Sequence, residues 1–300
     1  MKPSTVAAGL VIASSVFISN VSASVIIDYI TVGNIGNAAD TTGYGAVSYE
    51  YQIGKYEVTN AQYAEFLNAK ASTDSHGLYN SSMSSYGITR NGSSGSYTYA
   101  VTSGMENRPV VYVSWFDAAR FSNWLSNGQG NSDTEIGSYN LNGASSGLIL
   151  PIADAKIRLP SEDEWYKAAY YNGVTSTYSL YSNGQNTITT ADANYNNSIG
   201  ASTDVGAYTS DPSSYGTFDQ GGNVWEWNDA IISSSSRGLR GGSWDYIGPR
   251  DILHSSFRYL NSPSNENAGI GFRLASIVPE PTSMLLSMFA GGMMLIRRKR

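Results

Sequence analysis

Residues 222–227 of this chain read GNVWEW, and residues 240–244 read RGGSW. Each stretch combines a glycine-rich turn with tryptophan, and the region around them is rich in loop-forming residues. We interpret Trp227 as a core residue, whereas Trp225 and Trp244 fit a buried core and a surface cleft equally well. The sequence here predicts short strands and turns that carry large aromatic side chains.

Three arginines lie in or after these stretches, at Arg240, Arg258 and Arg273. A guanidinium fork pairs readily with a carboxylate. We therefore interpret all three as internal ion-pair or hydrogen-bonding groups rather than as binding groups for an anion.

Three short helices are predicted upstream, each by a capping box at its start. The boxes pair Thr59 with Gln62, Ser114 with Asp117, and Ser161 with Glu164. Residues 52–58 and 109–113 precede the first two boxes and have the composition of strands. Residues 71–104 and 127–147 are rich in Ser, Gly and Asn and are predicted as loops, the first with room for a hairpin at 97–101. Short helices on a loop-rich body that contains strands predict an α+β fold.

The first residues have the pattern of a secretory signal. A lysine at the start is followed by an apolar stretch over residues 6–21, and small residues follow up to Ala23. We predict a signal peptide over residues 1–23, with a buried N-terminal strand or helix as the alternative.

The last residues resemble a sorting signal. Pro-Glu-Pro at 279–281 is followed by an apolar run of 13 residues at 284–296 and a basic end at 297–300. This order resembles the PEP-CTERM signal of exported bacterial proteins, which a membrane protease, the exosortase, is thought to remove. Residues 278–300 are thus predicted as a sorting signal with a short transmembrane segment; the alternative is an ordinary membrane anchor. Both alternatives place the protein outside the cytoplasm, at the cell surface, in the outer envelope or in the medium, with a transient or retained anchor.

Composition excludes several kinds of site. The chain has no cysteine and two histidines, His76 and His254, far apart in sequence, so thiol chemistry and a three-histidine metal centre are excluded. Residues 24–281 hold all 24 acidic side chains and 13 of the 18 basic ones, a net charge of −11. That charge argues against a nucleic-acid partner and suits divalent cations or neutral glycans.

Six stretches together resemble one protein family. In order they are residues 57–60, 109–118, 158–165, 222–227, 240–244 and 271–274. They resemble the sulfatase-modifying, formylglycine-generating enzyme family, over about residues 47–275. The resemblance implies an irregular, loop-rich α+β domain related to C-type lectins, which we place at residues 24–277.

The resemblance does not carry the family's activity to this chain. Family enzymes oxidise a sulfatase cysteine through copper held by two thiols. The first thiol is expected two residues after the Gly-Gly-Ser-aromatic run. In this chain Asp245 and Tyr246 follow that run, and Asp251 stands where the second thiol is expected. None of these side chains is a soft ligand for Cu(I), so copper is not expected. Related iron enzymes of ergothioneine type need a histidine-rich partner region that this sequence lacks.

The resemblance also implies calcium sites and a ligand cleft. The matching calcium ligands are the side chains of Asp219 and Glu226, the carbonyls of Gly222 and Val224, and, for a second site, Asn194 and the carbonyl of Tyr195, with further ligands within 196–203. Oxygen ligands of this kind suit Ca²⁺; the alternative is a structural turn in which Glu226 bonds only backbone amides.

Trp225, Ser243 and Trp244 match positions near the family's substrate cleft. The function we expect is an exported, non-catalytic, calcium-stabilised, lectin-like domain that binds a glycan or a protein at the cell surface. Its other partners are the exosortase and the export machinery. The alternative is an enzyme of this family with a changed active site, or one that a partner completes.

Overall fold

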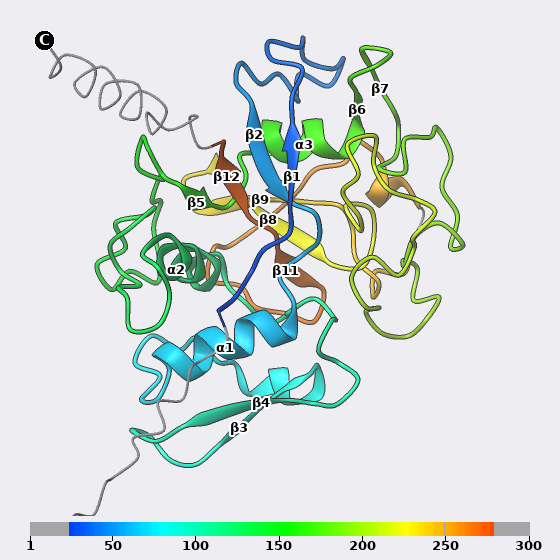
Figure 1. The fold of residues 1–300 in the computed structure, drawn as a ribbon. Helices are drawn as coiled ribbons and strands as arrows, with labels where there is room; N and C mark the ends of the chain where they lie inside the picture. Colours follow the sequence, from blue (N-terminus) through cyan, green and yellow to red (C-terminus); the bar gives the residue numbers. More distant parts are fainter. Residues whose placement is uncertain (1–23, 249, 279–300) are drawn as a thin grey trace, which may run out of the picture.

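The computed structural model describes residues 24–248 and 250–278, and within them it has the predicted α+β fold (Figure 1). The predicted signal peptide and nearly all of the predicted sorting signal lie outside these ranges. Among the described residues, none of the helices has the length and apolar composition needed to cross a membrane.

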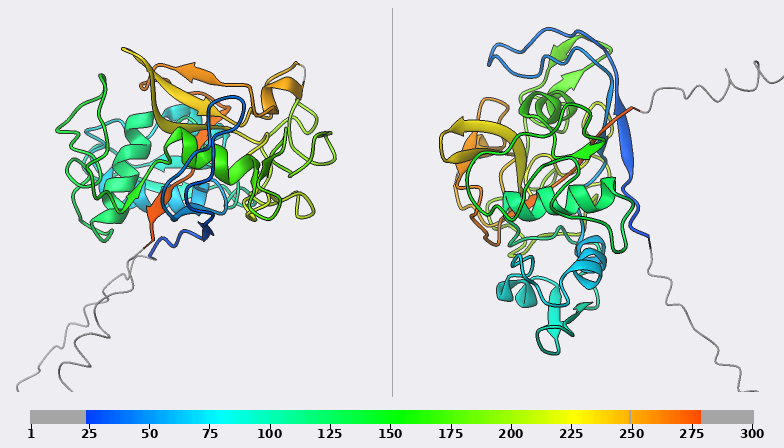
Figure 2. Two further views of the ribbon diagram at one scale, coloured as in Figure 1. Left: turned by 90° about the horizontal axis from the view of Figure 1, so that it is seen from above. Right: turned by 90° about the vertical axis from the view of Figure 1, so that its left-hand side faces the viewer.

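Two four-stranded sheets form the centre of the domain. The first has the order β1-β2-β12-β5 and is antiparallel throughout. The second has the order β10-β9-β8-β11, in which β8 and β11 run parallel. Figure 2 shows β1 and the β9–β10 pair on opposite sides of the molecule. The strands of the first sheet are β1 (Tyr29–Val32), β2 (Tyr51–Gly54), β5 (Ile157–Arg158) and β12 (Ala275–Ile277), and those of the second are β8 (Trp225–Ser233), β9 (Ser236–Arg240), β10 (Tyr259–Asn261) and β11 (Ile270–Phe272).

The helices begin where the capping boxes predict. They are α1 (Asn60–Lys70), α2 (Trp115–Ser126) and α3 (Glu162–Tyr170), and all three capping boxes are confirmed. Ser114, for example, accepts from the amide of Asp117 at 3.1 Å, and Asp117 accepts from the amide of Ser114 at 2.9 Å. These reciprocal bonds satisfy amides that the first helical turn leaves without a partner.

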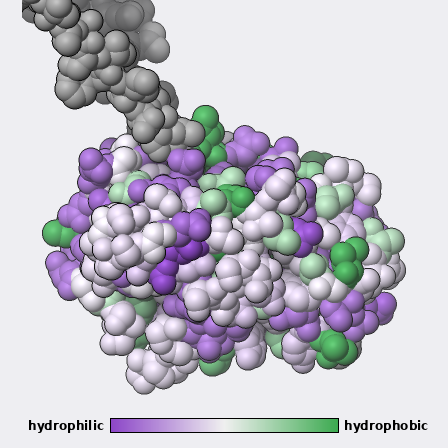
Figure 3. Space-filling view, turned by 90° about the horizontal axis from the view of Figure 1, so that it is seen from below, coloured by the Kyte–Doolittle hydropathy of each residue, from purple (hydrophilic) through white to green (hydrophobic). Residues whose placement is uncertain are grey.

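Aromatic side chains join α1 to α2. The ring of Phe66 on α1 lies 5.4 Å from Phe121 and 5.3 Å from Trp124 on α2. These side chains are almost completely buried, so the two helices share one core. The surface of the domain differs from this core. Seen from below, hydrophilic and neutral residues cover most of it, and strongly hydrophobic residues form small separate spots (Figure 3).

Two segments differ from the predicted strands. The segment 52–58 is a strand only as far as Gly54, because the backbone then turns to present the carbonyls of Gly54 and Lys55 to Arg273. The segment 109–113 is not a strand, and that prediction is wrong. Its only pairing is an isolated bridge at Pro109, and Tyr112 has a φ of 59°, which breaks an extended backbone.

The polar insertions hold more structure than predicted. The stretch 71–104 contains a 3₁₀ turn (Ser81–Ser85) and a hairpin of β3 (Ile88–Asn91) and β4 (Thr98–Val101). A hairpin is present as predicted, but the predicted range 97–101 forms only its second strand, and the hairpin begins at Ile88. A second hairpin pairs β6 (Tyr171–Asn172) with β7 (Thr177–Tyr178), and another 3₁₀ turn spans Arg250–Leu253.

All three arginines form ion pairs within the domain, as predicted; Arg240 and Arg273 are buried, whereas the side chain of Arg258 is 29% exposed. Arg240 and Arg258 both bind Glu162 at the start of α3, with nitrogen–oxygen distances of 2.7 and 2.5 Å. Arg273 binds Glu226 at 2.5 Å. The first pairings attach α3 to the β9–β10 region, and the last joins the end of β11 to β8.

Candidate functional site

A cavity of about 430 Å³ opens beside the start of β8. We call it the aromatic cleft because four of its eight lining side chains are aromatic. Its lining residues are Trp225, Ser243, Asp245, Tyr246, Phe257, Tyr259, Asn267 and Ile270. They come from β8, from the loop after β9, from β10 and the residues just before it, and from β11 and the residues just before it.

Three rings form one wall of the aromatic cleft. Trp225 lies 5.3 Å from Tyr259 and 5.9 Å from Phe257 between ring centroids, with interplanar angles of 32° and 36°. Trp225 is fixed by strand pairing: it lies opposite Ile270 of β11, and its amide donates to the carbonyl of Gly269 at 2.7 Å. Tyr259 keeps 44% of its surface exposed. The cleft therefore presents aromatic side chains to solvent, one of them on a paired strand.

Polar groups lie on another side of the cleft. The hydroxyl of Ser243 donates to Asp245 Oδ1 at 2.6 Å, and Asp245 itself is exposed. Gly269 leaves room for that carboxylate, because a Cβ there would come within 2.5 Å of Asp245 Oδ1. The side chain of Asn267 accepts from the Gly269 amide at 2.9 Å. Aromatic and hydrogen-bonding groups thus meet in one cavity.

The three tryptophans considered in the sequence analysis have different roles in the structure. Trp227 is fully buried and donates to the carbonyl of Val113 at 3.0 Å, so its core role is confirmed. Trp225 is 6% exposed and lines the cleft. Trp244 packs with Val111 and Val224 and is not among the lining residues, so the cleft brings together Trp225 and Ser243 but not Trp244.

Residues 37–278 match the family model described as the sulfatase-modifying factor enzyme 1-like domain. The chain belongs to this family.

Curated relatives of the domain carry different names. Hercynine oxygenase of Mycolicibacterium thermoresistibile is 27% identical over 200 residues, which cover 59% of this chain and 38% of that protein. Serine/threonine-protein kinase pkn1 of Chlamydia caviae is 28% identical over 191 residues, covering 57% and 24%. The chain thus matches well under two thirds of the length of these relatives.

Solved structures share the fold over nearly their full length. CarF has a TM-score of 0.57 and 22% identity, with 84% of this chain and 99% of that chain covered. Variable protein 1 of Treponema denticola also has a TM-score of 0.57, with 24% identity and coverages of 86% and 97%. At these identities the likeness concerns the fold alone.

The two positions expected for the family's thiols have different surroundings. Tyr246 lines the aromatic cleft and is 45% exposed, whereas Asp251 lies in the 3₁₀ turn outside its lining. Across residues 24–248 and 250–278, no three His, Cys, Asp or Glu side chains are grouped so that they could hold a metal. A phenol and a carboxylate are also poor ligands for Cu(I).

The first implied calcium set does not fit the ion at Glu226. Both carboxylate oxygens of Glu226 are occupied: Arg273 donates to Oε1 at 2.7 Å and to Oε2 at 2.5 Å, and Trp165 donates to Oε2 at 2.7 Å. Asp219 accepts from the Gly206 amide at 2.5 Å. A calcium ion at Glu226 would therefore compete with a guanidinium that already neutralises this carboxylate.

The second implied set keeps one feature of a cation site. The side-chain oxygen of Asn194 is buried and has no hydrogen-bond donor, while its amide nitrogen donates to Ala201 at 2.9 Å. The backbone carbonyl of Asn194 accepts from Asn223 at 2.8 Å. Gly222 allows this approach, because a Cβ there would lie 2.4 Å from that carbonyl oxygen. An unpaired buried acceptor is consistent with an ion or a water at Asn194.

Three carboxyl groups surround Arg273. Burial raises the pKa of Glu57 well above its ordinary value, and the charges of Asp219 and Glu226 raise it further. Burial also raises the pKa of Asp219 to about 6. Because Arg273 supplies a single positive charge and pairs with Glu226, the pKa values of the other two carboxyls stay above their ordinary values.

The sequence did not single out Phe257, Tyr259 or Asn267, which belong to the cleft. They lie in a stretch without helical or strand periodicity and between the family's sequence blocks. The pairing of β10 with β9, which sets Tyr259 opposite Leu239, brings the stretch to the cleft.

Proposed function

We propose that this chain is an exported, non-catalytic binding domain whose aromatic cleft takes a glycan. The observation that carries the proposal is the wall of Trp225, Phe257 and Tyr259 facing the polar pair Ser243 and Asp245. Sugar rings offer apolar C–H faces for stacking and hydroxyls for hydrogen bonds. A cleft with few polar groups on an aromatic surface supplies both kinds of contact.

The chemistry of the cleft favours binding over the family's oxidation reaction. Formylglycine formation in this family depends on two thiols, and the chain has no cysteine. Tyr246 in the cleft supplies a phenol, and Asp245 a carboxylate already bonded to Ser243. These groups can orient a bound ligand by hydrogen bonds without changing its oxidation state.

Export is part of the same proposal. The signal pattern at residues 1–23 and the Pro-Glu-Pro tail at 278–300 support delivery to the cell surface by the export machinery, followed by removal of the tail by an exosortase. A low share of charged side chains, 14%, suits a domain that meets neutral glycans.

An enzyme is the second candidate, supported by the likeness to hercynine oxygenase. The two histidines give it little: His76 lies 3.6 Å from Glu135, His254 lies beside Ser256, and neither lines the aromatic cleft. Such an activity would need metal ligands from another chain. Copper or iron retained by the purified chain would support this candidate.

A glycan array tests the proposal. The purified chain is applied with and without calcium, beside the variants Tyr259→Ala and Leu260→Ala. Both side chains lie on β10 with nearly equal exposure, 44% and 45%, but only Tyr259 lines the cleft. Glycan binding that Tyr259→Ala removes and Leu260→Ala keeps supports the proposal. No binding to any glycan, or capture of a protein through the cleft, contradicts the glycan assignment.

A further inference from the structure

One side of the aromatic cleft is negatively charged. Among its described lining residues Asp245 is the only charged side chain, and none is Lys, Arg or His. Its Oδ1 accepts from the hydroxyl of Ser243, while its Oδ2 accepts no hydrogen bond from the described residues. The side chain is exposed, so a ligand in the cleft can reach it. A charged group of that ligand therefore meets a carboxylate and no positive side chain.

The aromatic rings of the cleft attract positive charge as well. The face of a ring carries negative potential and attracts a cation that lies within about 6 Å of its centroid. Elsewhere in the domain the chain supplies such cations itself: the guanidinium of Arg237 lies 3.9 Å from the ring centroid of Trp115. Among the described residues, no Lys or Arg lies over a ring of the cleft. These rings are Trp225, Tyr246, Phe257 and Tyr259.

The basic residue nearest to these rings in sequence is held elsewhere. Arg258 stands between Phe257 and Tyr259, but its guanidinium donates to both carboxylate oxygens of Glu162, at 2.8 and 2.5 Å. It also lies 5.4 Å from the ring centroid of Tyr44. Arg258 is thereby attached to the start of α3, while its two neighbours line the cleft. The rings of the cleft remain open to a cation that a ligand brings.

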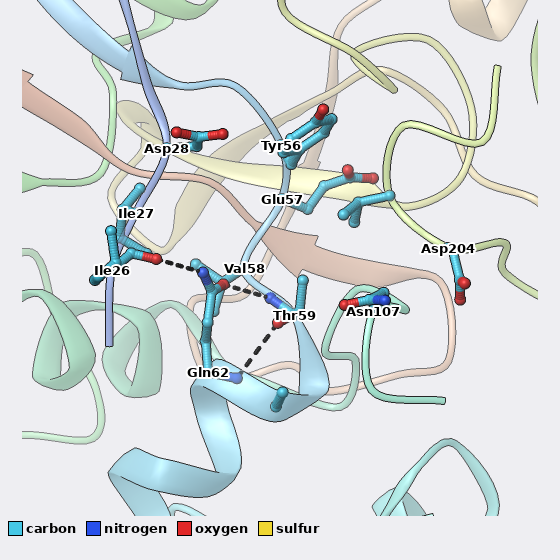
Figure 4. A pocket seen from close by; sticks show the side chains of 12 residues that line it. Ile26, Ile27, Asp28, Tyr56, Glu57, Val58, Thr59, Gln62, Asn107 and Asp204 are labelled. Atoms are coloured by element: carbon cyan, nitrogen blue, oxygen red, sulfur yellow. Dashed lines mark hydrogen bonds between the residues drawn. The ribbon is translucent and has the colours of Figure 1, made fainter. Parts of the chain in front are cut away.

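A larger cavity at the start of α1 lacks this combination. It has a volume of about 570 Å³ and shares no residue with the aromatic cleft. Figure 4 shows Asp28 and Asp204 on opposite sides of it. Tyr56 is the one aromatic side chain among its described lining residues, and the ammonium of Lys55 already lies 5.2 Å from the centroid of that ring. Asp204 is exposed there, which makes it a control for Asp245.

We propose that the aromatic cleft takes a sugar unit with a free, protonated amino group, in a glycan that is otherwise neutral. The inference rests on the proposed function and names its ligand class. The apolar face of the sugar lies on the aromatic wall, and its ammonium lies at the ring faces beside Asp245. N-acetylation would remove the positive charge. A uronic acid would bring a second carboxylate to Asp245 with no basic side chain to offset the repulsion.

The first test titrates the purified chain with methyl glycosides and follows the indole NMR signal of Trp225. The probes are the methyl glycosides of glucosamine, N-acetylglucosamine and glucose and the same three forms in the galacto series, which differ within each series in the group at C2. The free amines are expected to bind roughly tenfold more tightly than either neutral form, from a cation–π contact and an exposed ion pair together. Equal or weaker binding of the amines would overturn the inference and leave the glycan proposal intact.

Charge variants locate the amino group. The measured quantity is the ratio of the affinity for the glucosamine glycoside to that for the glucose glycoside. Asp245→Asn is expected to lower this ratio about threefold, because the rings still attract the amine. Asp204→Asn removes the same charge at the other cavity and is expected to keep the ratio of the unmodified chain. Equal ratios in the two variants would contradict the assignment.

Two further comparisons separate this inference from the proposed function. If glycans of the array bind and none of the methyl glycosides does, the amine assignment fails alone; if no glycan and no glycoside binds, both fail. Nα-acetyl-lysine methylamide carries an ammonium without a sugar ring. If it binds as tightly as the glucosamine glycoside, the cleft belongs to a peptide ligand, and both proposals are overturned. Weaker binding of this probe supports the amino sugar.

Discussion

Arg273 holds Glu226 by both carboxylate oxygens, with Nε 2.5 Å from Oε2 and Nη2 2.7 Å from Oε1. The arginine follows β11, the glutamate lies on β8, and both are fully buried. Parallel pairing sets Gly271 opposite Glu226, so two separate sequence blocks of the family meet in one ion pair. Removing one partner of such a pair leaves a buried charge without compensation.

Glu226→Gln is therefore expected to destabilise the domain by about 3–5 kcal/mol. Urea unfolding measures the change, and the loss is expected to be the same in calcium and in chelator. Glu50→Gln, at an exposed side chain, is the control, with a change within about 0.5 kcal/mol. A loss that appears only when calcium is present would instead make Glu226 an ion ligand.

Calcium is expected to stabilise the domain by binding at the unpaired side-chain oxygen of Asn194. A ligand at a hundredfold excess over its Kd stabilises by about 2.7 kcal/mol, and each kcal/mol moves Tm by roughly 2–4 °C in a domain of this size. Differential scanning calorimetry should show a rise of several degrees that chelation reverses and Asn194→Ala abolishes. An equal Tm of the unmodified chain in calcium and in chelator would show that the unpaired Asn194 oxygen needs no ion.

Tyr259→Ala is expected to weaken glycan binding by about two- to twelvefold, because an aromatic contact contributes roughly 0.5–1.5 kcal/mol. Isothermal titration with the best ligand from the array gives the comparison. Leu260→Ala, the neighbour on β10, should bind as the unmodified chain does. Equal losses in the two variants would mean that β10 was disturbed rather than the cleft.

Asp229 is expected to make stability fall as pH rises. Burial raises the pKa of Asp229 from 3.8 to about 7, and its Oδ1 has no donor, while Tyr139 donates to Oδ2. Between these two pKa values the folded state binds a proton that the unfolded state has released, so this group favours folding less as pH rises from 4 to 7. Asp117, whose pKa burial also raises to about 7, contributes in the same direction.

Asp229→Asn should remove up to about 1.4 kcal/mol per pH unit from that slope, the value for one proton. Unfolding free energies at several pH values from 4.5 to 7.5 provide the measurement. Asp154→Asn should keep the slope of the unmodified chain. An unchanged slope in Asp229→Asn would show that this carboxyl titrates normally.

Export predicts a mature chain that ends near Pro281 and begins near Ser24. Intact-mass analysis of material from the cell surface checks both ends. Full-length chain recovered from the cytoplasm would contradict export, and a surface form that keeps residues 284–296 would favour the membrane anchor.

Local signals in the sequence predicted local structure well. The three helices begin at their capping boxes, since a box depends only on residues within one turn. The prediction of a strand at 109–113 was wrong because the backbone there depends on a residue distant in sequence. The amide of Tyr112 donates to the carbonyl of Asn267, and the backbone turns at Tyr112 to make this bond. Side-chain composition carries no information about that contact.

The candidate site was predicted in part for the same reason. Trp225 and Ser243 could be named because they lie in the family's sequence blocks. Phe257 and Tyr259 could not, because only the pairing of β10 with β9 brings them to Trp225. The arginines could be predicted as internal ion-pair groups from their chemistry, but the choice of Glu226 for Arg273 depends on the strand register.

The position of β12 between β2 and β5 has a mechanical consequence. The strand that leads toward the C-terminal tail is hydrogen-bonded on both sides, rather than lying at the sheet edge. A force applied to the chain beyond β12 would load both ladders at once. Extracting β12 would then require the sheet to break along two lines, so this strand is held more firmly than an edge strand would be, in a chain without cysteine.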